Sequence, residues 1–236
     1  DIRYHLEKAL YMAVTGRPGP VWLDIPLDVQ GAVIETENLR AYDPAENPEQ
    51  KPQEISQEII EKILDKIEES HRPVLSPGNG VRLAGAIGEF HELVELLGVP
   101  VVTGMSSVDA LESDHPYFAG RSGGTGTRAG NFALQNSDVL LSIGNRQGFT
   151  QTGFQYQDWA RESYTILNDI DENELKKPSL HVSLPVVGDA GELIRGLLAE
   201  AEKRGADKGH PLFKGEDWRN QCLLWREKYP VVTQKH

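Results

Sequence analysis

The sequence has one cysteine, Cys222, so it contains no disulfide framework and no metal site built from several cysteines. It also lacks any run of about 18 apolar residues, the length that a membrane-spanning helix needs. The formal net charge is −12, which argues against nucleic acid or an anionic membrane as the main partner. A single cysteine is consistent with a reducing, cytoplasmic setting. What remains is a chain of 236 residues, enough for one complete domain and flanking segments.

The first part of the chain does not look like part of that domain. Apolar residues at helical spacing predict an amphipathic helix from Ile2 to Thr15, and the apolar run Val21–Ile25 predicts a strand. Because a lone strand leaves its backbone unpaired and both faces uncovered, we expect residues 1–30 to be the end of another domain. Residues 31–54 carry prolines among charged residues without periodicity, which is typical of an extended linker.

Residues 55–204 alternate between amphipathic helices and short apolar strands. Five strands are predicted at 73–75, 99–103, 138–143, 164–170 and 182–187, and a sixth is expected near 116–120. This alternation predicts an α/β fold, a Rossmann-like six-stranded parallel sheet with helices on both faces. Residues 205–236 are expected to begin with a loose polar segment, to contain a final helix at 218–227, and to lead as a linker toward a further domain.

Polar residues and glycines follow four of the predicted strands. They are Gly78-Asn79-Gly80, Gly144-Asn145-Arg146, Asp169-Ile170-Asp171 and Gly188-Asp189. Open parallel sheets bind ligands at the carboxyl ends of their strands. Glycines let backbone N–H groups approach a pyrophosphate, an arginine pairs with phosphate, and a carboxylate accepts from ribose hydroxyls. These features favour a nucleotide site, but turns at strand ends need the same residue types, so a purely structural role stays open.

Two segments resemble a known family. Gly16–Val29 closely resembles the end of the pyrimidine-binding domain of thiamine-diphosphate enzymes of the acetolactate synthase type, and residues 72–201 resemble their middle domain. The family has a Gly-x-x-Gly-x-x-Gly-Thr loop followed by a helix in that domain. The residues that fall there are Gly120, Gly123, Gly126, Thr127 and Asn131, and Gly144, Arg146, Asp169, Ile170 and Asp189 follow in family order.

The resemblance implies a homo-oligomeric enzyme of three α/β domains that decarboxylates a 2-keto acid and transfers the resulting acyl carbanion equivalent. Thiamine diphosphate and Mg²⁺ would serve that reaction. In the family, the catalytic glutamate would precede Asp1 and the metal–diphosphate motif would follow His236. The resemblance therefore implies no catalytic residue and no metal ligand in this chain, and no activity of this chain alone. Residues 205–236 would lead toward a diphosphate-binding domain.

Members of this family hold FAD, ADP or nothing in the middle domain. The resemblance assigns cofactor binding to the ten residues named above, from Gly120 to Asp189. The sequence departs from the synthases after Arg146, where it reads Gln147-Gly148-Phe149 in place of Phe-Asp-Asp, and Thr125 stands where the family usually has histidine. A bound nucleotide and a cleft filled by side chains near Phe149 are therefore both open.

Two other functions are weighed against this one. A stand-alone nucleotide-binding module without catalysis would use the first thirty residues to extend the sheet at an edge. An NAD-dependent deacylase of the sirtuin type would need a catalytic histidine and usually four zinc-binding cysteines, which the single Cys222 does not provide.

Overall fold

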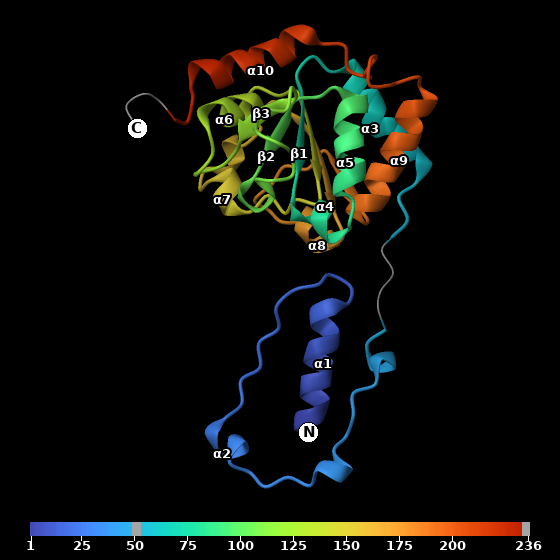
Figure 1. Ribbon diagram of the computed structural model, residues 1–236, viewed down its shortest axis with the longest axis vertical. Helices are drawn as coiled ribbons and strands as arrows, with labels where there is room; N and C mark the ends of the chain where they lie inside the picture. Colours follow the sequence, from blue (N-terminus) through green and yellow to red (C-terminus); the bar gives the residue numbers. More distant parts are fainter. Residues whose placement is uncertain (49–52, 233–236) are drawn as a thin grey trace. The chain divides into compact units, whose positions relative to one another are not determined.

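The computed structural model describes residues 1–48 and 53–232. The chain divides into two compact units, Asp1–Lys51 and Pro52–His236. The larger unit contains a six-stranded sheet in the order β3-β2-β1-β4-β5-β6, and every neighbouring pair is parallel (Figure 1). The strands are β1 Pro73–Pro77, β2 Val101–Thr103, β3 Phe118–Arg121, β4 Val139–Ile143, β5 Tyr164–Asp169 and β6 Leu184–Val187. The predicted Rossmann-like parallel sheet is confirmed, including the sixth strand near residues 116–120.

Helices cover both faces of this sheet. They are α3 Gln57–Glu69, α4 Asn79–Leu83, α5 Ile87–Leu97, α6 Arg128–Gln135, α7 Phe149–Thr152, α8 Glu172–Leu175, α9 Ala190–Lys203 and α10 Glu216–Lys228, with short 3₁₀ turns at Met105–Ser107 and Tyr156–Asp158. Helix α9 packs on both α3 and α5, and these three form one layer (Figure 1). Helices α6 and α10 pack on each other and on β3.

The core lies where the apolar pattern of the sequence places it. Strands β1 and β4 are buried along their whole length, as expected for central strands of a parallel sheet. Helix α3 begins after Ser56, whose Oγ accepts from the backbone N–H of Ile59, and it buries Ile60, Ile63 and Leu64 on one face. Burying each such side chain stabilises the fold by about 1.5–3 kcal/mol.

The segment after residue 204 belongs to this unit. The backbone N–H of Leu212 donates to the Leu96 carbonyl at 2.8 Å, and that of Phe213 donates to the Leu97 carbonyl at 3.0 Å. The expectation of a loose segment here is therefore wrong, because hydrogen bonds to the end of α5 fix it. The predicted final helix is confirmed as α10, and its Trp218 Nε1 donates to the Pro73 carbonyl at 2.9 Å.

The smaller unit contains α1 Ile2–Val14, as predicted, with α2 Leu27–Gln30 and 3₁₀ turns at Thr36–Asn38 and Pro44–Glu46. The predicted strand Val21–Ile25 is wrong, because these residues have no regular secondary structure. A strand needs a neighbour to accept its hydrogen bonds, and this unit provides none within its described residues. Trp22 is 90% exposed.

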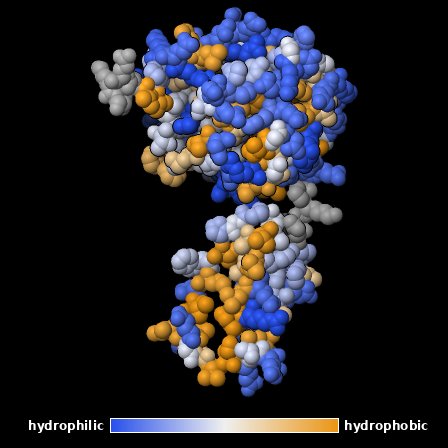
Figure 2. Space-filling view, viewed as in Figure 1, coloured by the Kyte–Doolittle hydropathy of each residue, from blue (hydrophilic) through white to orange (hydrophobic). Residues whose placement is uncertain are grey.

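Part of the predicted linker folds back on α1. Tyr42 is only 8% exposed, its ring centre lies 5.5 Å from those of Tyr4 and Tyr11, and its backbone N–H donates to Glu7 at 2.8 Å. The Tyr4 hydroxyl donates to Glu46 at 2.8 Å. Residues 49–52 of the predicted linker lie outside the described residues. Figure 2 shows many apolar side chains on the surface of this unit. Leu10, Leu27 and Val33 are among its exposed apolar residues.

Candidate functional site

Buried polar residues gather at the carboxyl ends of the strands. At or near the last residues of β1 to β5, and in the segments that follow, the buried polar residues are Ser76, Thr103, Ser107, Ser122, Ser142, Asn145, Gln147, Asn168 and Asp169. Because all strands are parallel, these residues share one edge of the sheet. This is the edge at which open α/β sheets bind ligands, so it is the candidate site.

The strand order reverses between β1 and β4, and here two backbone segments meet closely. A Cβ atom on Gly80 would lie 2.7 Å from Gly144 Cα, and one on Gly78 would collide with the Gly144 carbonyl. Gly144 also has φ +56°, a conformation that favours glycine. The Gly80 N–H donates to the Gly144 carbonyl at 3.0 Å. The predicted Gly144 thus lies at the switch point, where its first role is to permit this contact.

Side chains fill the space beside this contact. Asn145 Oδ1 accepts from the backbone N–H of Gln147 at 3.2 Å, and Gln147 Nε2 donates to Ser142 Oγ at 3.0 Å. Gln147 is 2% exposed and has φ +48°, which is uncommon for a residue other than glycine. The segment after β4, where the sequence departs from the synthases, therefore packs against the carboxyl ends of the strands.

The glycine loop after β3 is held together by its own residues. The Gly123 N–H donates to Asn131 Oδ1 at 2.9 Å, and Asn131 Nδ2 donates back to the Gly123 carbonyl at 3.1 Å. Thr127 caps α6 by accepting from the Gly130 N–H at 3.0 Å. The predicted Gly120, Gly123, Gly126, Thr127 and Asn131 do lie together, and Asn131 and Thr127 make contacts that shape the loop.

This loop meets the segment that follows β4. The Gly124 N–H donates to the Thr150 carbonyl at 3.0 Å, and Gln151 packs against both Gly123 and Gly104. Ser122 Oγ donates to Gln151 Oε1 at 3.4 Å. The segment after β3 and the segment after β4 are thus linked across the end of β2.

Arg146 points toward α8. Its side chain is 64% exposed and pairs with Glu174 at 2.5 Å, while Lys177 Nζ lies 2.9 Å from the other Glu174 oxygen. Burial raises the pKa of Glu174, but hydrogen bonds from Lys177 and Arg146 outweigh it, and the pKa lies below its ordinary value. The predicted phosphate partner therefore has a charged carboxylate at its side.

The predicted ribose contacts serve the turns in which they lie. Asp169 is 4% exposed, and its Oδ1 accepts from the Asp171 N–H at 3.0 Å. Asp189 caps α9, with Oδ1 accepting from Gly191 and Glu192 at 2.9 and 3.1 Å. Ile170 is partly exposed in the turn between β5 and α8. These are the turn and capping roles that the sequence left open, and they leave nucleotide contact by these residues as a proposal.

Three polar atoms at this edge have no hydrogen-bond partner. They are Thr103 Oγ1, Arg121 Nε and Gln147 Oε1, all buried among the described residues. Native structures satisfy most buried polar groups, so each of these atoms calls for a partner outside the described residues, such as a water molecule or a ligand. Sequence reasoning missed all three residues. Arg121 gives only a weak signal, an arginine between a strand and a glycine loop.

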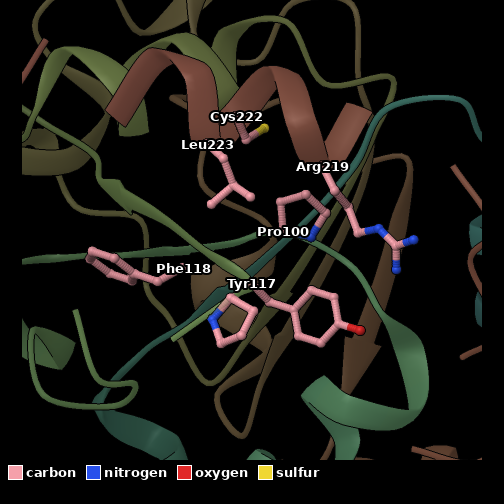
Figure 3. Close-up of a pocket in the computed structure, with 7 residues that line it drawn as sticks. Pro100, Tyr117, Phe118, Arg219, Cys222 and Leu223 are labelled. Atoms are coloured by element: carbon pink, nitrogen blue, oxygen red, sulfur yellow. The ribbon is translucent and has the colours of Figure 1, made fainter. Parts of the chain in front are cut away.

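A hollow elsewhere in this unit does not serve the site. It lies between α10 and the amino ends of β2 and β3, and Figure 3 shows Leu223 pointing toward Pro100 and Phe118. Arg219 lies 5.8 Å from the centre of the Tyr117 ring. In these contacts α10 packs against the sheet at the edge opposite to the candidate site.

Within residues 1–48 and 53–232 there is no group of three or more His, Cys, Asp or Glu side chains able to hold a metal ion. No helix in the same described ranges has the length and apolar character needed to cross a membrane.

Comparison with known proteins identifies the relatives of this chain. Residues 60–197 match the family described as thiamine pyrophosphate enzyme, central domain. A probable acetolactate synthase large subunit of Methanocaldococcus jannaschii is 38% identical over 84% of this chain and 34% of its own length. The acetolactate synthase large subunit of Corynebacterium glutamicum is 35% identical over 88% of this chain and 32% of its own length.

The acetolactate synthase isozyme 3 large subunit of Escherichia coli is 28% identical over 100% of this chain and 40% of its own length. The chain thus spans about a third of the length of the curated relatives it matches.

Proposed function

Because the chain belongs to the thiamine pyrophosphate enzymes through their central domain, we propose that it is the middle part of a 2-keto acid decarboxylase or carboligase. The observation that carries this proposal is the match to acetolactate synthases over 84–100% of the chain. Thiamine pyrophosphate, when bound, supplies the electron sink for such chemistry. We assign its site, and that of Mg²⁺, to parts of a homo-oligomeric parent enzyme outside this chain.

The smaller unit fits the end of a pyrimidine-binding domain. Leu10 is 68% exposed, Leu27 is 83% exposed and Trp22 is 90% exposed, and burying such side chains is worth about 1.5–3 kcal/mol each. The Escherichia coli relative matches the whole chain, these residues included. We therefore propose residues 1–30 as the end of that domain, 31–54 as a connection, 55–204 as the middle domain, and 205–236 as the approach to a diphosphate-binding domain.

For the middle domain we propose a structural role and a nucleotide site for FAD or ADP at the carboxyl edge. The glycine loop, Arg146 and Asp189 are the proposed contacts, with Asp169 and Ile170 beside the ribose. The support is the position of this edge and its buried polar atoms that have no partner in the described part of the chain. A phosphate at Arg146 would compete with Glu174, which now pairs with it.

Titration of the chain with FAD and with ADP tests this site. We expect saturable binding that Arg146→Ala and Asp169→Ala each weaken by about tenfold or more, as loss of a charge-assisted contact would. Arg161→Ala is the matched control, because Arg161 precedes β5 at the opposite edge and pairs, among the described residues, only with its neighbour Glu162. Absence of binding would favour a cleft filled by the protein's own side chains.

A stand-alone nucleotide-binding module is the competing function. The two differ in one property, since only an enzyme of this family binds thiamine pyrophosphate through its complete chain. Thiamine pyrophosphate binding by the complete parent protein supports the enzyme, and nucleotide binding without it supports the module.

A further inference from the structure

The side chain of Arg121 is the most informative feature that the proposed function does not use. Every other arginine in residues 1–48 and 53–232 has an ion pair, a hydrogen bond, an aromatic contact or another interaction. The Arg121 guanidinium has none within these described residues, although Arg121 is only partly exposed and its Nε is buried. The chain has 36 acidic and 24 basic residues, so carboxylates are plentiful, yet none of those in the described part of the chain pairs with this arginine.

Thr103 lies directly beside Arg121. The two residues are partners in the register of β2 and β3, each at the last position of its strand. Gly120 faces α6, because a Cβ there would meet Thr127 Oγ1 and the Gly130 N–H. Side chains alternate along a strand, so Arg121 and its lateral neighbour Thr103 lie on the opposite face from α6. Thr103 is 0% exposed, and its Oγ1 has no partner.

The chemistry of these atoms decides what is missing. Arginine Nε–H donates and never accepts, and a threonine hydroxyl can donate. Gln151 adds a third donor nearby, because its Nε2 packs against Gly104, the residue after Thr103, and makes no hydrogen bond among the described residues. These three donors have no acceptor within residues 1–48 and 53–232, and a group that carries several acceptor oxygens and negative charge would satisfy all of them.

We propose that the carboxyl ends of β2 and β3 bind a phosphate group through Arg121 and Thr103, with Gln151 at the rim. A tetrahedral phosphate offers oxygens in three directions, which suits donors from two strands and from α7, whereas a planar carboxylate suits a single arginine fork. This site lies apart from Arg146, the phosphate contact proposed above. It depends on the nucleotide proposal only if the phosphate belongs to FAD or ADP.

Calorimetric titration at low ionic strength tests the site, with inorganic pyrophosphate, ADP, adenosine and acetate as probes for the 236-residue chain. We expect pyrophosphate to bind, and Arg121→Met to weaken it by about tenfold to hundredfold, the effect of losing a charged hydrogen bond. Thr103→Val, which keeps the side-chain shape, should weaken it about fivefold. Arg161→Met, at the opposite edge, should change it by less than twofold.

The probes separate the source of the phosphate. ADP binding much tighter than pyrophosphate supports a nucleotide, and equal affinities support free phosphate. Pyrophosphate binding with no ADP binding would contradict the nucleotide proposal and keep this one. Lack of pyrophosphate binding, acetate binding as tight as pyrophosphate, or unchanged binding by Arg121→Met would overturn the phosphate site.

A second measurement needs no variant. Phenylglyoxal modifies accessible guanidinium groups, and peptide mapping reports the extent at each arginine of the unaltered chain. Pyrophosphate should slow modification of Arg121 at least severalfold and leave Arg161 unchanged. Equal rates at Arg121 with and without pyrophosphate would contradict the site even if Arg121→Met failed to fold.

Discussion

Replacing Trp218 by Phe tests whether α10 is part of the middle-domain fold. Trp218 is 6% exposed, its Nε1 donates to the Pro73 carbonyl at 2.9 Å, and its ring meets that of Trp225 edge to face at 5.7 Å. Phenylalanine cannot donate, so the buried carbonyl would lose its hydrogen bond at a cost of about 1–3 kcal/mol. The weaker ring contact adds about 0.5–1 kcal/mol. We expect Trp218→Phe to lower the free energy of unfolding by about 1.5–4 kcal/mol.

The assay is urea unfolding followed by far-ultraviolet circular dichroism, which reports helix and sheet content without relying on tryptophan fluorescence. Trp22→Phe is the matched control, because Trp22 is 90% exposed and a surface substitution changes stability by less than about 0.5 kcal/mol. If Trp218→Phe also stays within that range, α10 is attached loosely and residues 205–236 are a linker, which would refute the reasoning.

Three further predictions concern single positions in the larger unit. Gly80→Ala should destabilise the protein by more than about 2 kcal/mol, because the added Cβ would push the turn after β1 away from Gly144. Gly88→Ala should stabilise it by about 0.5–1 kcal/mol, because Gly88 lies in α5 with open space around it. The urea midpoints of the two variants measure both effects. Because the pKa of Glu174 is lowered in the folded state, its carboxylate stabilises the fold fully above pH 4.5, the ordinary pKa, and this stabilisation is lost as the pH falls through the folded-state pKa. The difference in unfolding free energy between the parent chain and Glu174→Gln should therefore shrink in acid, and a difference that grows there contradicts this. Burial raises the pKa of the Cys222 thiol to about 12, so a thiol reagent at pH 8 should label it only after unfolding, and rapid labelling of the folded chain would place the thiol at the surface.

Much of the sheet could be predicted because its strands are short apolar runs with turn residues at each end. Val139–Ile143 is buried at every position, and a short apolar run of this kind in an α/β pattern is typical of a central strand. Residues 99–103 were predicted as one strand, but β2 begins only at Val101, after a proline that has no N–H to donate. The apolar run Val21–Ile25 shows the limit of this reasoning, because strand formation depends on a partner that local sequence does not reveal.

The sheet edge that carries the candidate site was predictable, but the contacts among its residues were not. Parallel strands end at one edge, so Gly144, Arg146 and Asp169 had to lie near each other in the fold. The pairing of Arg146 with Glu174 joins residues from different strand-end segments, and no periodicity indicates it. Thr103 and Arg121 were missed for a related reason, because the lack of a partner becomes visible only when neighbouring strands are placed side by side.

Thiamine pyrophosphate binding tests the central claim most directly, that this chain is the middle of a larger thiamine-dependent enzyme. The complete parent protein and the 236-residue chain would be titrated side by side with thiamine pyrophosphate and Mg²⁺, and carbon dioxide release from pyruvate would be followed in both. We expect the complete protein to bind the cofactor and the chain alone neither to bind it nor to release carbon dioxide above the blank. Binding by the chain alone, or no binding by the complete protein, would contradict the account.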